Sequence, residues 1–311
     1  MKKGLKKFLI SAAVVLAVVV VADLAIGKVV DRMLPAISNQ GQLGSTYFAL
    51  NEVEYPVLVV GSSRAKHHYF PSIMQDSLGF EVYNIARNGC FFSYNSCVIQ
   101  SILDRYTPKM IVWETSMDAL SSDNDPLESL YPYYGKNRFV TECVDAECNW
   151  TERVPLVSNL YKYNSNLIRI ASRYAARKSY PEDKLNGYIP LPPKKWTPAE
   201  RNTSASEAVE VVDEIKVQRF KSVLSMALEK GVRLIVVNSP SYMASDKVSE
   251  SERQMQQICD SMGVKIFNFA RAEGIYDNID CWVDYGHMSS TGAEIYTRRF
   301  VDMIVNRNIN D

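Results

Sequence analysis

The sequence predicts an α/β fold built on a parallel, doubly wound sheet. Short apolar runs rich in β-branched residues alternate with longer amphipathic stretches, and this happens in two regions, 57–113 and 208–305. Strands that alternate with helices are joined by right-handed crossovers, which make neighbouring strands parallel. A third observation is an apolar segment close to the amino terminus, which stands outside this alternation.

The first region holds three expected strands and one expected helix. The run Val57-Leu-Val-Val60 ends at Gly61 and is typical of a buried strand. Segments 81–85 and 109–113 are the next two strands, and residues 93–106 between them are expected to form a helix.

The second region begins with a long amphipathic helix over residues 208–230, which has a basic residue in its last turn and is closed by Gly231. Its remaining expected elements, in chain order, are a strand at 232–237, a helix at 248–262, a strand at 264–267 and a helix at 291–305.

Residues 119–205 break the alternation and are rich in Tyr, Pro and Asn, with one amphipathic helix around 157–177. One interpretation is an insertion that caps the domain, in which the aromatic side chains pack, as most aromatic residues do. The other is that they line a glycan-binding groove. The aromatic residues in question are Tyr131, Tyr133, Tyr134, Trp150, Tyr161, Tyr163 and Trp196.

Residues 8–27 form an apolar segment in which Asp23 is the only charge, and four lysines precede it. Twenty helical residues span about 30 Å, the thickness of a bilayer's hydrocarbon core. The lysines favour a cytoplasmic amino terminus. We therefore expect a basic tail at 1–7, a transmembrane anchor in the lipid bilayer at 8–27, a linker at 28–54 and an extracytoplasmic domain at 55–305.

A cleaved signal peptide is the alternative to an anchor. The apolar run is near the upper length for a signal sequence, and no clean A-x-A cleavage site follows it. The sequence thus favours a single-pass protein of the inner (cytoplasmic) membrane with a periplasmic or extracellular domain. Removing residues 1–27 takes away four lysines and one aspartate, which leaves 31 basic and 34 acidic residues outside.

The composition excludes several classes of function. The 311 residues include 35 basic and 35 acidic side chains, so the chain lacks the basic excess of a nucleic-acid-binding protein. With three histidines and no C-x-x-C pair, it shows no zinc-ligand spacing, and we expect neither a metal nor a cofactor. Six cysteines in an exported chain can pair in fifteen ways, of which a loop-closing bridge between Cys143 and Cys148 is one.

Two local motifs carry candidate chemistry. Ser63 lies in Gly61-Ser-Ser-Arg-Ala65, directly after a buried strand, at the sheet edge where parallel α/β proteins bind ligands. By itself such a serine is more typical of a helix N-cap than of a nucleophile. Asp284 and His287 precede the last expected helix, and a carboxylate three residues from an imidazole can fix its tautomer and stabilise its charged form.

Together these motifs resemble those of the SGNH (GDSL-type) hydrolase family, which has a flavodoxin-like three-layer fold. The resemblance covers roughly residues 55–118 and 206–305. It implies that Ser63 is the nucleophile, in a G-S-S block where the family has G-D-S, and that Asp284 and His287 complete a catalytic triad. An α/β-hydrolase elbow fits less well, because that fold separates its Asp and His widely and has an H-G-G-G segment that this chain lacks.

The resemblance also implies an oxyanion hole made by the backbone N–H groups of Ser63 and Gly89. In the family a third block, G-x-N-D, supplies an Asn donor, but Met117 stands at that position here. We expect Asn88 or Ser116 to replace the missing donor. Losing one such donor lowers the rate about a hundredfold or more.

Three neighbouring features remain. Arg64 follows the nucleophile and could bind an anionic substrate group, and Glu114 at the end of the third strand could bind a sugar hydroxyl. A solvated arginine and a buried or capping carboxylate are the alternatives. His67 and His68 are expected to be surface or packing residues.

Within the family, a membrane-anchored domain with a G-S-S block is similar to the D-alanyl-lipoteichoic acid biosynthesis and alginate O-acetylation proteins. That similarity implies a serine esterase or O-acyltransferase acting on an exported cell-envelope polysaccharide, with a membrane-bound O-acyltransferase as partner. The alternative, favoured by Met117, is a weak or inactive protein of the same fold that binds glycan or such a partner.

Overall fold

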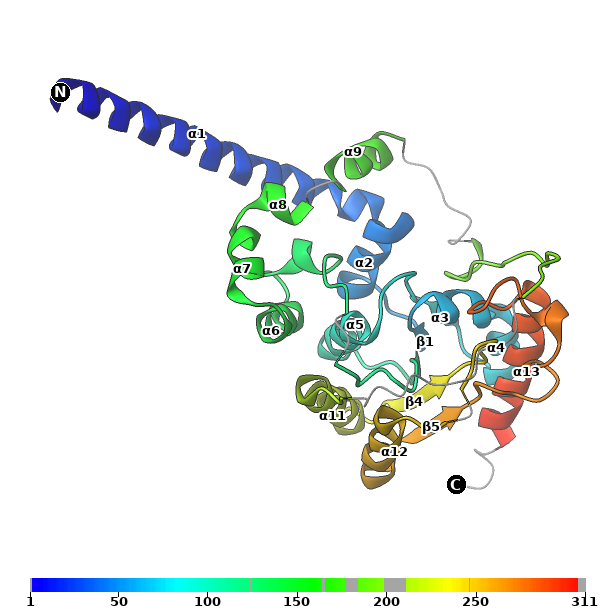
Figure 1. Cartoon of the computed structure of the whole chain (residues 1–311). Helices are drawn as coiled ribbons and strands as arrows, with labels where there is room; N and C mark the ends of the chain where they lie inside the picture. Colours follow the sequence, from blue (N-terminus) through cyan, green and yellow to red (C-terminus); the bar gives the residue numbers. More distant parts are fainter. Residues whose placement is uncertain are drawn as a thin grey trace. The chain divides into compact units, whose positions relative to one another are not determined.

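A computed structural model of the protein describes residues 2–122, 125–163, 166–176, 184–198, 211–245 and 247–306 (Figure 1). The chain divides into two compact units. One unit consists of residues 1–47 and 128–178, and the other consists of residues 48–127 and 179–311.

The second unit is built on a five-stranded sheet in which every neighbouring pair of strands is parallel. In chain order the strands are β1 (Val57–Val60), β2 (Val82–Asn84), β3 (Met110–Glu114), β4 (Arg233–Asn238) and β5 (Lys265–Asn268). Their spatial order is β2-β1-β3-β4-β5. The predicted parallel, doubly wound sheet is confirmed. Because the order reverses beside β1, the crevice at the carboxyl ends of β1 and β3 is the topological switch point where such sheets bind ligands.

Helices cover both faces of this sheet (Figure 1). One face carries α3 (Ser63–His68), α4 (Pro71–Leu78) and α13 (Ser290–Asn306), and the other carries α5 (Phe92–Arg105), α11 (Glu214–Glu229) and α12 (Glu250–Met262). Helix α11 begins at Glu214, because the Asp213 side chain accepts a hydrogen bond from the N–H of Ile215 and caps the helix there. Residues 211–213, predicted to be helical, are not, and residues 208–210 of the predicted helix lie outside the described residues.

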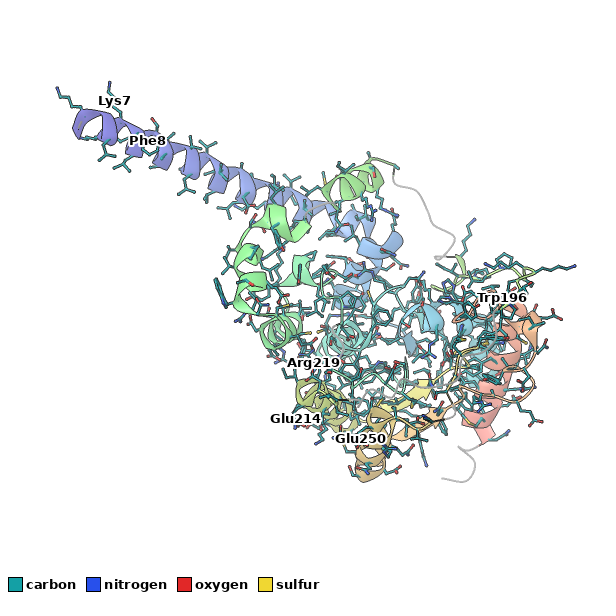
Figure 2. All side chains as sticks on the ribbon, in the orientation of Figure 1. Lys7, Phe8, Trp196, Glu214, Arg219 and Glu250 are labelled. Carbon is teal, nitrogen blue, oxygen red and sulfur yellow. The ribbon has the colours of Figure 1, made fainter. Side chains whose placement is uncertain are left out.

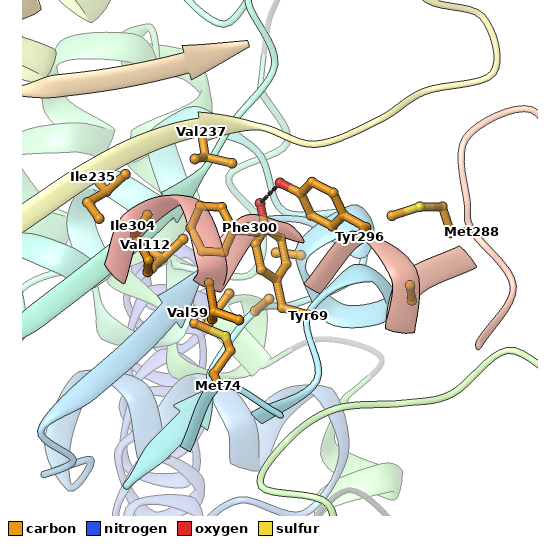
Figure 3. Close-up of a cluster of buried hydrophobic side chains, with 14 of the residues drawn as sticks. Val59, Tyr69, Met74, Val112, Ile235, Val237, Met288, Tyr296, Phe300 and Ile304 are labelled. Carbon is orange, nitrogen blue, oxygen red and sulfur yellow. Dashed lines mark hydrogen bonds between the residues drawn. The ribbon is translucent and has the colours of Figure 1, made fainter. Parts of the chain in front are cut away.

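The core explains why the strands are continuous apolar runs rather than alternating ones. Alternate residues of a strand point to opposite faces, and here both faces are buried. On one face, strand residues such as Val59 and Val112 pack against Tyr69 and Phe300 (Figure 3). On the other, the Trp113 ring stacks on Phe92 and packs against Phe220, with centroids 5.4 and 5.5 Å away.

The described part of the first unit is helical. Its elements are α1 (Lys2–Met33), η1 (Pro35–Ile37), α2 (Gly41–Asn51, whose end enters the second unit), η2 (Tyr131–Tyr133), α6 (Arg138–Glu147), α7 (Trp150–Arg153), η3 (Val154–Val157), α8 (Asn159–Tyr163) and α9 (Asn166–Ala176). Helix α1 is long and apolar enough to cross a membrane, and a signal sequence has the same features. Its apolar side chains are exposed from Phe8 to Leu24 (Figure 2).

The segment 28–54, expected to be a linker, is largely helical. It contains the last turns of α1 and all of η1 and α2. Val30, Leu34 and Ile37 are buried against Tyr163 and Ile170, so the end of α1 belongs to the packed core of the first unit.

The expected insertion at 119–205 is divided between the two units, since residues 128–178 join the first and residues 184–198 the second. The single helix predicted around 157–177 is two helices, α8 and α9, and residues 164–165 and 177 lie outside the described residues.

The considered bridge between Cys143 and Cys148 is absent from the structure. The Cys143 thiol is buried on α6 and donates to Oε1 of Glu147 over 3.7 Å. The Cys148 thiol, just after α6, lies 3.9 Å from the Tyr131 hydroxyl.

Candidate active site

Ser63 is the first residue of α3 and follows β1 by way of Gly61 and Ser62. A Cβ atom on Gly61 would lie 2.6 Å from Cβ of Ala65 and 2.7 Å from the carbonyl oxygen of Glu114. Only glycine therefore allows the turn to approach the end of β3 this closely. Ser62 occupies the N-cap position without a side-chain capping bond, and the Ser63 side chain makes its hydrogen bond elsewhere.

Ser63, His287 and Asp284 form a hydrogen-bonded chain in which His287 contacts both of the other two residues. The Ser63 hydroxyl is 2.8 Å from Nε2 of His287, and Nδ1 of the same ring is 3.0 and 3.1 Å from the two carboxylate oxygens of Asp284. A carboxylate only accepts, so the partners assign the ring proton to Nδ1 and leave Nε2 to accept from the serine. This geometry lets His287 act as a general base toward Ser63.

The Asp284 carboxylate also shapes its own loop. Its Oδ1 accepts from the backbone N–H groups of Gly286 and His287 over 2.9 and 2.8 Å. Burial raises the pKa of Asp284, but these bonds and the His287 ring lower it more, so its pKa lies below the usual value and it is ionised at neutral pH. The D-x-x-H spacing thus orients the imidazole by local hydrogen bonds alone.

His67 and His68 are buried, which matches packing rather than a surface position. His67 donates from Nδ1 to the carbonyl of Ile189 over 2.7 Å, and its ring meets that of His287 edge-on at 5.5 Å. His68 accepts at Nε2 from the N–H of Met288, the residue after His287, over 3.0 Å. Burial lowers the pKa of His67 and holds that of His68 well below its usual value, so His68 stays neutral.

A buried polar network starts at His68 and ends beside the nucleophile. Because Nε2 of His68 accepts, Nδ1 donates to the Ser239 hydroxyl over 2.9 Å, and that hydroxyl donates to Oε1 of Glu114 over 3.0 Å. Arg64 completes the network through a 3.0 Å ion pair with the same oxygen. Arg64 is therefore neither a solvated side chain nor a free anion site, and Glu114 is 1 % exposed.

Asn88 and Gly89 form an exposed turn after β2. The N–H of Arg87 donates to the carbonyl of Gly61 over 3.0 Å, which holds this turn at the sheet edge that carries Ser63. Gly89 has φ +71°, a left-handed conformation that favours glycine. Met117, at the position where the G-x-N-D motif has Asn, is 7 % exposed and offers no side-chain donor.

A cavity of about 350 Å³ opens at the switch point. Arg64 after β1, Glu114 and Ser116 at the end of β3, and Phe91 and Asn95 at the start of α5 contribute to its wall. Among the described residues no group of three or more His, Cys, Asp or Glu side chains is placed to hold a metal ion.

Sequence reasoning missed two parts of this site. The contact between His68 and Ser239 joins residues 171 positions apart, so local sequence patterns could not predict it. The one available signal was that two of the chain's three histidines, His67 and His68, lie within five residues of Ser63. Trp196 lies edge-on to both Tyr242 and Tyr285, with ring centroids 5.1 Å away. Of the two interpretations of this tryptophan, packing and a glycan-binding groove, the structure shows packing, against the loop that carries His287.

No family model matches the chain, and no curated protein matches it in sequence. Among solved structures it is similar to the psychrotrophic esterase EstA from a Pseudoalteromonas species, with 10% identity over 83% of this chain and 100% of that one and a TM-score of 0.43. It is also similar to a lipase/acylhydrolase from Enterococcus faecalis (11% identity, 81% of this chain and 96% of that one, TM-score 0.41). A third likeness is to a GDSL-like lipase from Bacteroides thetaiotaomicron (7% identity, 85% and 99%, TM-score 0.37).

Proposed function

We propose that this protein is an SGNH-type serine esterase that forms an acyl-enzyme on Ser63, with His287 as general base and Asp284 orienting it. The observation that carries the proposal is the continuous hydrogen-bonded chain from the Ser63 hydroxyl through His287 to Asp284, with heavy-atom distances of 2.8 and 3.0 Å. A serine needs such a base because its hydroxyl is a weak nucleophile at its own pKa.

The proposed reaction proceeds in two acyl-transfer steps. Oγ of Ser63 attacks the ester carbonyl while Nε2 of His287 takes its proton, and the tetrahedral intermediate expels the alcohol, which receives that proton. Water or an acceptor hydroxyl then attacks the acyl-enzyme and gives its proton to Nε2 of His287. His287 passes that proton to Oγ of Ser63 as the bond between Oγ and the acyl group breaks, which restores the free serine and the neutral imidazole. Throughout, Asp284 keeps the proton on Nδ1 and stabilises the imidazolium.

The proposed oxyanion donors are the backbone N–H groups of Ser63 and Gly89, with the Asn88 side chain as the replacement for the family's Asn. Ser63 opens α3, so its N–H has no carbonyl partner within the helix. With Met117 at the Asn position, we expect turnover to be slower by about a hundredfold or more than with a complete set of donors.

We further propose that the enzyme is anchored in the cytoplasmic membrane through residues 8–27 and modifies an exported polysaccharide, as an O-acyltransferase that works with a membrane-bound acyltransferase. Support for retention of α1 comes from its carboxyl end. Both carboxylate oxygens of Asp23 accept hydrogen bonds at the start of α8, including those from the N–H groups of Asn159 and Leu160. Cleavage beyond Asp23 would remove this cap from the folded unit.

The test is covalent labelling of the full-length, detergent-solubilised protein with a fluorophosphonate, together with turnover of p-nitrophenyl acetate. We expect labelling of the parent chain and none of Ser63→Ala, with turnover lowered by at least about a thousandfold. Adding a polysaccharide acceptor is expected to speed release of the acyl group from Ser63.

Ser62→Ala is the matched control for labelling, because Ser62 is adjacent but has no side-chain bond in the cap it occupies. It is expected to retain the label. A label that persists in Ser63→Ala would remove Ser63 from its role. Absent turnover in the parent chain combined with tight glycan binding would support the non-catalytic alternative.

A further inference from the structure

The first unit carries exposed apolar side chains along α7, η3 and α8. They follow one another at intervals of three or four positions, with one adjacent pair at the end, and each is at least 43 % exposed. The members of this apolar stripe are Trp150, Val154, Val157, Leu160 and Tyr161. Val157 is the extreme case, because it is 82 % exposed. Exposed apolar surface that continues over neighbouring elements marks a contact with a protein or a membrane.

The same segment also has an inward side. Leu156 is buried, and Tyr163 packs with Val30 in the core at the end of α1. The segment therefore fills the core of the first unit with other residues than those of the apolar stripe. Burial within the described part of this unit does not account for the stripe.

Contacts between α1 and α8 fix where the stripe lies along α1. The Asp23 carboxylate accepts hydrogen bonds from the backbone N–H groups of Asn159 and Leu160 over 2.9 and 2.8 Å. One turn further along α1, a Cβ atom on Gly27 would lie 2.5 Å from Cγ of Asn159, so glycine allows the two helices to meet there. The start of α8 is thus held beside residues 23–27 of α1.

That position corresponds to a defined depth in a bilayer that α1 crosses. Asp23 is 16 positions after Lys7, the last lysine before the apolar run, so the two residues lie about 24 Å apart along the helix. A hydrocarbon core about 30 Å thick then has its outer boundary about 6 Å beyond Asp23, and tilting the helix moves Asp23 deeper. The exposed residues Lys28 and Arg32 follow beyond that boundary.

The stripe faces the side of the first unit on which the bilayer would lie. In Figure 1, α7 and α8 are on the side of this unit from which the apolar part of α1 extends. The start of α8, with stripe residues on either side of it, is therefore at the level where the hydrocarbon core meets the lipid headgroups.

We propose that the apolar stripe inserts into the outer interfacial layer of the bilayer that α1 crosses. Val157 and Leu160 reach the acyl chains at this boundary, and tryptophan and tyrosine are the side chains that membrane proteins concentrate in the interfacial layer. The first unit then contacts the lipid surface at two places, which fixes its depth and limits its rotation about α1. The proposal rests on the proposed anchor and adds a second contact to it.

The test measures the depth of single sites in the full-length protein, reconstituted in vesicles of phosphatidylethanolamine and phosphatidylglycerol. A nitroxide is attached at Val157→Cys, at Val15→Cys within the apolar run and at Arg32→Cys beyond it. Electron paramagnetic resonance then compares the collisions of each nitroxide with oxygen, which concentrates in lipid, and with a nickel chelate, which stays in water. The parent chain, treated in the same way, gives the background of the native cysteines.

We expect the ratio of oxygen to nickel collisions to fall in the order Val15→Cys, Val157→Cys, Arg32→Cys. Val154→Cys is a second site on the stripe and is expected to resemble Val157→Cys. Both side chains are exposed, so neither substitution removes a core contact.

Ratios at both stripe sites equal to that of Arg32→Cys would overturn the proposal, because the stripe would then lie in water. Nitroxides shielded from both reagents would also overturn it, because they indicate a contact with a second copy of the chain. A nickel-accessible nitroxide in Val15→Cys would remove the anchor and the stripe proposal with it. Val15→Cys in lipid with both stripe sites in water would remove the stripe proposal alone.

Discussion

The three histidines of the chain lie close together, yet each has a different hydrogen-bond environment. His287 lies between a hydroxyl and a carboxylate, His67 donates to a backbone carbonyl, and His68 accepts a backbone N–H. A neutral imidazole has one donor and one acceptor, so its partners decide which nitrogen carries the proton. Only the partners of His287 suit a group that must take and return a proton.

His68 makes folding stability depend on pH. Burial holds its pKa well below the unfolded value of about 6.5, so below that pH the unfolded chain binds a proton that the native state excludes. Stability is then present above about pH 6.5 and falls as the pH is lowered, by up to about 1.4 kcal/mol per pH unit for this one proton. Denaturant unfolding of the full-length protein in detergent between pH 5 and 7.5 measures the slope.

His68→Gln is expected to lower the free energy of unfolding. It is also expected to reduce the slope of that free energy against pH by up to the contribution of one proton, while the contribution of His67 to the slope remains. Equal pH slopes in the parent and His68→Gln would contradict a neutral, buried His68.

At the scale of elements, the turn from β1 into α3 brings the nucleophile to the sheet edge. Gly61 lies against the end of β3, and Arg87 from the segment after β2 bonds to its carbonyl. The ends of three neighbouring strands are therefore packed around the residue that precedes Ser62 and Ser63. Such a turn has little room to shift without displacing the serine.

Gly61→Ala tests this packing. A Cβ 2.7 Å from the Glu114 carbonyl forces the backbone to move, and we expect a loss of about 1–3 kcal/mol in stability together with loss of fluorophosphonate labelling at Ser63. Thermal unfolding and labelling of the same sample provide both readouts.

Gly79→Ala is the control, because Gly79 ends α4 with φ +71° and no atom lies near its Cβ position. It is expected to cost about 1–2 kcal/mol of stability from backbone strain alone and to keep full labelling. Labelling of Gly61→Ala at the parental rate would show that the close approach is not required for the site.

At the scale of the whole molecule, the two parts of α1 lie in different environments. Its first two-thirds expose apolar side chains along the helix, while its last turns pack in the core of the first unit and bind α8 through Asp23. A cleavable signal sequence has no need of such contacts. The helix is therefore suited to remain attached to the folded chain.

We expect the full-length protein to stay in the membrane pellet after alkaline carbonate extraction, because a spanning helix is inserted almost irreversibly. A variant lacking residues 2–22 keeps Asp23 and is expected in the soluble fraction when it is produced in the cytoplasm. Release of the full-length chain by carbonate, or a mature amino terminus beyond residue 22, would contradict an uncleaved anchor.

Local patterns in the sequence determined the strands, most helices and the two motifs of the candidate site. Periodicity identifies β1 to its exact bounds and α13 to within a residue, and the Asp284–His287 pair needs only three residues of chain to form. These features depend on neighbours in sequence. For the same reason the pattern did not reveal that residues 28–54 are largely helical or that α11 starts at Glu214, after its N-cap Asp213.

Only the tertiary structure decided how distant residues meet. Ser63 and His287 are 224 positions apart, and the links from His68 to Ser239 and from Glu114 to Arg64 depend on the order of strands in the sheet. A residue's own type specifies what it can donate or accept, and the fold specifies whether a partner is there.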